Sequence, residues 1–140
     1  MMKLPVLLGL ALGSLLAADP AGLVYWPKGI PPDGGPKGAK FGDHSLGISH
    51  RDKNGVPEVH EKQTDVMVIQ NGEAVLIIGG AVVDPKTESP GEIRGTSIRN
   101  GVEKKLSPGD ILNIPAGMPH QFLLEPGKQI TYFVVKVGKP

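Results

Sequence analysis

Residues 109–120 read Gly-Asp-Ile-Leu-Asn-Ile-Pro-Ala-Gly-Met-Pro-His, a short apolar run enclosed by two turn-forming sequences. Residues 107–110, Ser-Pro-Gly-Asp, predict a β-turn before the run, and residues 115–119 predict another directly after it. A four-residue apolar run between two such turns is typical of a strand and too short for a stable helix. The second turn therefore places His120 at the start of the next predicted strand.

The same alternation of short β-rich runs and turns extends over residues 44–138. Asn-Gly pairs at 54–55, 71–72 and 100–101 are the strongest short signals for tight β-hairpins. No helical period of useful length appears in this part of the chain. The pattern predicts an all-β domain over 44–138, folded as an antiparallel barrel or sandwich.

The first 43 residues divide into two parts of different composition. Residues 1–18 carry Lys3, an apolar run too short to span a bilayer comfortably and a small-residue end, which predicts a cleavable signal peptide. We therefore expect a secreted or periplasmic protein without a stable membrane anchor; an uncleaved anchor or a buried helix stays open. Residues 19–43 are rich in Pro and Gly and predict an irregular arm that lies over the barrel or reaches a neighbouring subunit.

Composition excludes several classes of function. The chain of 140 residues has no cysteine, so disulfides, thiolate metal sites and cysteine nucleophiles are absent. Its 15 basic and 14 acidic residues balance to a net charge of +1, and only 4% of residues are aromatic. Nucleic-acid binding needs a concentrated basic face or stacking platforms, so we expect no nucleic-acid partner.

Four polar residues form a candidate metal site. Glu58 and His60 are two positions apart in a predicted strand and therefore project from the same face. A barrel can bring Asp65, which begins the next β-rich run, and the distant His120 to the same place. Two imidazoles and up to two carboxylates suit a first-row divalent metal and leave positions open for water or substrate. On chemistry alone, a structural or surface role for each histidine stays open.

The stretch that ends at His120 resembles the second motif of the cupin family. It has Gly109, five residues, Pro115-Ala-Gly117, two residues and then the histidine, without a gap. Several fixed positions agree at once, which makes this match specific.

Residues 58–72 resemble the first cupin motif. They read Glu58-Val-His60, four residues, Asp65, six residues and Gly72. Glu58 stands where the family has a histidine, and Asp65 stands where it has a glutamate. The resemblance covers about residues 45–137.

The resemblance implies a small single-domain cupin, an antiparallel double-stranded β-helix or jelly-roll barrel with an irregular Pro/Gly-rich N-terminal arm. It implies a divalent metal held by Glu58, His60, Asp65 and His120. The carboxylates favour Mn²⁺ or Fe²⁺, with Zn²⁺ as an alternative. Cupins often form dimers, so a homodimer is compatible with the resemblance.

The function stays open between three classes. The first is a metal-dependent enzyme, for which the resemblance implies an oxygenase, isomerase, lyase or decarboxylase. The second is a metal-free module that binds a small ligand such as a sugar or organic acid, and the third is a structural or assembly barrel. His50, Glu92 and Arg94 are candidates for a substrate pocket, where an arginine holds anionic groups; a solvated strand edge is the alternative for each.

Overall fold

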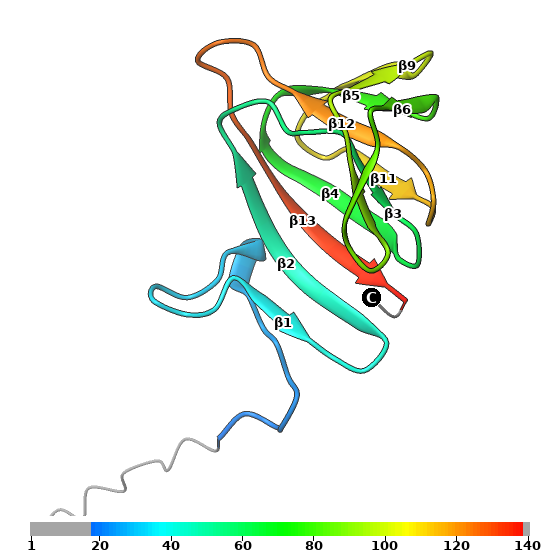
Figure 1. The fold of residues 1–140 in the computed structure, drawn as a ribbon. Helices are drawn as coiled ribbons and strands as arrows, with labels where there is room; N and C mark the ends of the chain where they lie inside the picture. The colour runs from blue at the N-terminus through cyan, green and yellow to red at the C-terminus, as the bar shows by residue number, and fades with distance from the viewer. Residues whose placement is uncertain (1–17, 139–140) are drawn as a thin grey trace, which may run out of the picture.

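In the computed structural model, which describes residues 18–138, the chain forms three antiparallel sheets (Figure 1). The five-stranded sheet has the order β1-β2-β13-β4-β11, the six-stranded sheet β10-β5-β12-β3-β8-β7, and the two-stranded sheet β6-β9. The strands are β1 (Gly38–Lys40), β2 (His44–Arg51), β3 (Glu58–His60), β4 (Thr64–Gly72), β5 (Ala74–Ile78), β6 (Ala81–Val83), β7 (Lys86–Ser89), β8 (Glu92–Arg94), β9 (Ser97–Arg99), β10 (Val102–Leu106), β11 (Ile111–Ile114), β12 (His120–Leu123) and β13 (Ile130–Val137).

The all-β prediction is confirmed. Within residues 18–138, no helix is long and apolar enough to cross a membrane. The predicted signal peptide lies, apart from Ala18, outside the described residues.

The Asn-Gly pairs join strands of different sheets, so the prediction of three hairpins is wrong. Asn71-Gly72 ends β4, which pairs with β13 and β11, whereas the following β5 pairs with β10 and β12. Gly72 has a φ of 81° and lies against the backbone of Gln129, which leaves no room for a side chain. The tight turn is therefore real, but it sends the chain across the barrel rather than back along the same sheet.

The core lies between the two larger sheets, and strand alternation explains its composition. In β13, Ile130, Tyr132 and Val134 are buried, whereas the residues between them are only partly buried. Tyr132 stacks on Phe122 of the opposite sheet, with ring centroids 5.0 Å apart. Burying a side chain of this size contributes about 1.5–3 kcal/mol. The core cluster consists of Met67, Ile69, Ala74, Leu76, Leu106, Ile114, Phe122, Ile130, Tyr132 and Val134.

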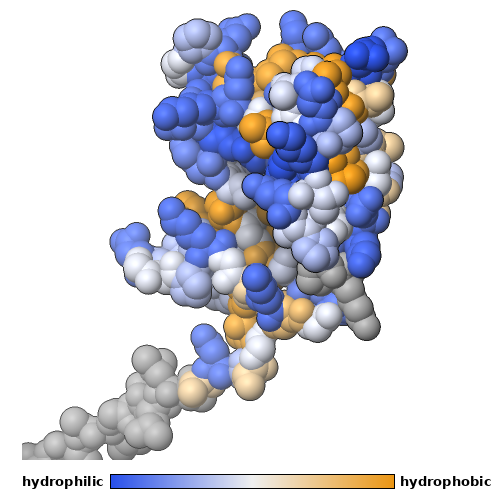
Figure 2. Space-filling model, in the orientation of Figure 1, coloured by the Kyte–Doolittle hydropathy of each residue, from blue (hydrophilic) through white to orange (hydrophobic). Residues whose placement is uncertain are grey.

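The Pro/Gly-rich arm packs on its own barrel. It is irregular apart from a 3₁₀ turn, η1 (Pro27–Gly29), and strand β1, which pairs with β2 at the sheet edge. Trp26 meets the ring of Phe133 edge-on, with centroids 6.3 Å apart, and Gln70 donates a hydrogen bond to the Gly29 carbonyl. Figure 2 shows hydrophobic side chains gathered where the arm joins the barrel. The arm therefore covers part of the outer face of the five-stranded sheet.

Candidate metal centre

Three polar side chains are buried in the described part of the chain, and all three belong to the predicted metal site. His60, Asp65 and His120 have exposed fractions of 6%, 2% and 2%. Burying such groups costs free energy unless each has hydrogen-bonding partners. They line a cavity of about 390 Å³ inside the barrel.

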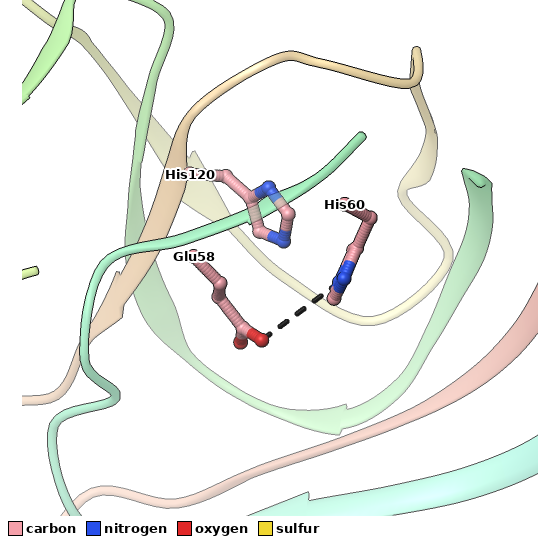
Figure 3. Close-up of side chains that lie close together, drawn as sticks. All are labelled: Glu58, His60 and His120. Carbon is pink, nitrogen blue, oxygen red and sulfur yellow. Dashed lines mark ion pairs between the residues drawn. The ribbon is translucent and has the colours of Figure 1, made fainter. Parts of the chain in front are cut away.

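Strand pairing brings Glu58, His60 and His120 together. Glu58 and His60 lie two apart on β3, and β12 pairs with β3 so that His120 faces Glu58 in the register. One ligand atom from each of the three side chains lies within 4.8 Å of the other two (Figure 3). Two residues from one strand and one from its neighbour therefore form a single cluster.

Hydrogen bonds at Nδ1 orient both imidazoles toward this cluster. Glu92 on β8 lies 2.6 Å from His60 Nδ1, and the Met118 carbonyl lies 3.1 Å from His120 Nδ1. A carbonyl or carboxylate oxygen accepts, so each Nδ1 donates and Nε2 is the ring nitrogen that remains as a possible ligand atom. Metal-binding histidines commonly have such partners. Burial lowers the pKa of His120 and favours the neutral form that binds metal.

The donor types suit a divalent ion, and the Glu58 and His60 donors are close enough to share one. Two ligand atoms that each lie about 2.1 Å from one ion are at most about 4.2 Å apart. The 3.8 Å between Glu58 Oε2 and His60 Nε2 falls within that limit. Two imidazoles and one carboxylate are a set used for Fe²⁺ and also suit Zn²⁺ and Mn²⁺.

Asp65, the fourth predicted ligand, is not part of the three-residue cluster, although its Oδ2 lies 3.5 Å from His60 Nε2. Both of its carboxylate oxygens contact Lys136 Nζ, at 2.8 and 2.9 Å. Burial raises the pKa of Asp65, but the neighbouring His60 imidazole and the Lys136 ammonium outweigh that effect and hold the pKa below its usual range. Asp65 is therefore an ionised partner of a lysine, and its side chain is one methylene shorter than the glutamate of the cupin motif.

Lys136 is the site residue that sequence reasoning missed. Its Nζ lies 3.0 Å from His60 Nε2 as well as contacting Asp65. The available signal was strand alternation, because position 136 continues the inward series of Ile130, Tyr132 and Val134. A lysine at an inward position is rare and marks a specific partner.

Two arginines enclose the carboxylate of Glu58. Arg51 Nη2 lies 3.0 Å from Glu58 Oε1, and Arg94 Nη2 lies 3.3 Å from Oε2. Arg94 also contacts Glu92 at 3.1 Å. Arg94 and Glu92, both predicted as pocket residues, line the cavity, and Arg51 lines it as well.

His50 is a correction to the predicted pocket. Its neighbours Ser49 and Arg51 line the cavity, so alternation along β2 turns His50 to the outside of the sheet. It is exposed there, and its Nδ1 lies 2.8 Å from Thr131 Oγ1.

Comparison with solved structures identifies the fold. A conserved protein with a double-stranded β-helix domain from Klebsiella pneumoniae is similar to this chain, with 18% identity, a TM-score of 0.52 and coverage of 71% of each chain. This chain has the cupin fold. A cupin protein from Bacteroides fragilis is also similar, at 16% identity and a TM-score of 0.48, over 70% of this chain and 68% of that one.

A longer protein shares the cupin fold over part of its length. The DMSP lyase DddQ from Ruegeria pomeroyi is 16% identical, with a TM-score of 0.50, and the match covers 69% of this chain. The match spans 39% of the lyase. No family model matches this cupin-fold sequence, and no curated protein matches it.

Proposed function

We propose that this chain is a cupin that holds one divalent metal ion with Glu58, His60 and His120 and binds a small molecule beside it. The observation that carries the proposal is the convergence of three donor atoms inside a cavity, where hydrogen bonds at Nδ1 orient both imidazoles. Three protein ligands leave coordination positions open toward the cavity. A bound ion would act there as a Lewis acid or bind oxygen.

An organic acid is the ligand class that the charge of the cavity favours. The lining has more cationic side chains than carboxylates even before an ion is added, and a divalent ion increases that excess. An arginine also holds a carboxylate in a geometry that a neutral sugar does not match. The cations are Lys40, Arg51, Arg94 and Lys136, and the carboxylates are Glu58, Asp65 and Glu92.

A metal-free binding module is the second candidate, and the position of Lys136 favours it. The ammonium group lies 3.0 Å from His60 Nε2, one of the atoms that would bind the ion. In that case the same cavity would capture an organic acid through its cations alone.

Metal analysis separates the two candidates. The untagged protein, incubated with Mn²⁺, Fe²⁺ or Zn²⁺ and then desalted, is analysed by mass spectrometry for bound metal. We expect close to one ion per chain. Protein that stays metal-free with every ion would contradict the metal-binding proposal and leave the metal-free module.

Removing the partner of His60 should weaken metal binding. The Glu92→Ala variant loses the acceptor that fixes the proton of His60 on Nδ1 and its ring orientation. We expect the Kd for Mn²⁺ or Zn²⁺, measured by calorimetry, to rise about 10–100-fold. Glu88→Ala is the matched control, because the exposed Glu88 contacts Arg94 and no histidine. Equal affinities for the two variants would show that the Glu92 contact does not orient the ligand.

We further propose that the chain is exported with cleavage after Ala17 or Ala18, as the pattern of residues 1–18 supports. Expression in a bacterial host with its export machinery intact should give a mature protein that begins at Ala18 or Asp19. N-terminal sequencing of the extracytoplasmic fraction measures this. Recovery of the chain only in the cytoplasm with residues 1–18 retained would contradict export.

A further inference from the structure

Lys136 contacts one of the ligand atoms of the candidate metal centre. Its ammonium group can only donate hydrogen bonds, so His60 Nε2, 3.0 Å away, must accept. The same nitrogen has a single lone pair, and a metal ion would need that lone pair. His60 Nδ1 offers no alternative, because it donates to Glu92. The lysine and the ion therefore compete for one atom.

The backbone holds Lys136 in this position. Lys136 on β13 faces Asp65 on β4 in the strand register, and its ammonium contacts both oxygens of that carboxylate. Asp65 is 2% exposed and has little access to water as an alternative partner. The ion pair therefore keeps the ammonium next to His60 and keeps Asp65 occupied.

We propose that Lys136 is a resident cation that lowers the metal affinity of the site by holding His60 Nε2 and by keeping Asp65 from acting as a fourth ligand. This inference rests on the proposed metal-binding function. For an ion to bind, the ammonium has to leave His60 Nε2 and remain on Asp65 alone. Two cations at such close range also repel each other, more strongly inside a protein than in water.

The test is metal affinity with and without the lysine charge. Calorimetric titration with MnCl₂ and with ZnCl₂ compares the wild type with Lys136→Met, which keeps the length of the side chain but removes the ammonium. We expect the variant to bind at least about tenfold more tightly, since it frees His60 Nε2 and leaves a buried carboxylate beside it. Lys136→Arg, which keeps a cation, should stay near the wild-type affinity, and so should the exposed control Lys128→Met, whose lysine pairs with Glu73.

A second pair of variants protects the test against misfolding of the single variant. Asp65→Asn/Lys136→Met replaces both charges by neutral groups, which avoids a buried unpaired carboxylate. It should bind metal more tightly than Asp65→Asn alone, because only the double variant lacks the competing ammonium.

The outcomes separate this inference from the proposed function. If the wild type binds metal, two equalities would overturn the role of Lys136 and leave the metal site standing. The Kd of Lys136→Met would equal that of the wild type, and the Kd of the double variant would equal that of Asp65→Asn. Absence of binding in every variant would overturn both. Binding only after the lysine is removed would support competition by Lys136.

Discussion

Replacing His120 with Ala should weaken the binding of Mn²⁺ or Zn²⁺ by at least about 100-fold, because it removes one of only three ligands. Loss of a partner that merely orients a ligand already costs about 10–100-fold in affinity. His120 is 2% exposed, and its Nδ1 donates to the Met118 carbonyl, so Nε2 is the ligand atom that the substitution removes. Calorimetric titration of the untagged variant measures the change.

His50→Ala is the matched control for this experiment. It makes the same chemical change on the outer side of β2, away from the cavity, and should leave the Kd unchanged. Thermal melts of both variants establish that each is folded at the titration temperature. A folded His120→Ala protein with wild-type affinity would place the ion elsewhere.

Leu76→Ala should lower the free energy of unfolding by about 2–5 kcal/mol. Leu76 lies on β5 with an exposed fraction of 0% and belongs to the cluster between the two larger sheets. Truncation removes buried apolar surface and leaves a cavity that the surrounding strands fill only in part. Urea unfolding followed by circular dichroism measures the difference.

The control for the core is Leu23→Ala, the same substitution at a residue that is 54% exposed. Its effect should stay within about 0.5 kcal/mol. A small effect at Leu76, comparable to that at Leu23, would contradict the placement of the core between the sheets.

The sequence predicted where strands occur better than it predicted which strands pair with each other. Short β-rich runs and turn residues indicate strands wherever they occur, since both signals are local. The pairing of β13 with β4 and β2 is long-range, and no local pattern encodes it. The Asn-Gly pairs illustrate this difference. Asn71-Gly72 makes a tight turn, but the apolar faces of β4 and β5 form opposite walls of the core, so the turn connects two sheets.

The predicted site shows the same difference between local patterns and long-range pairing. Glu58 and His60 share a face by simple alternation, and the turn before His120 places the second imidazole at the start of β12. Asp65 pairs with Lys136 instead of joining the cluster. Lys136 lies 71 positions away in the sequence and is brought to Asp65 by the register of β4 and β13. Spacing along the chain cannot reveal a partner of that kind, although the inward position of Lys136 was visible once β13 was recognised as alternating.

A crystal structure of the protein grown with Mn²⁺, with anomalous diffraction to locate the ion, tests the central claim most directly. We expect a single site within about 2.0–2.3 Å of a Glu58 oxygen and of the Nε2 atoms of His60 and His120. Lys136 Nζ should have moved away from His60 while still contacting Asp65. An ion bound by other residues, or a cavity in which Lys136 remains on His60 and no ion appears at saturating Mn²⁺, would contradict the claim.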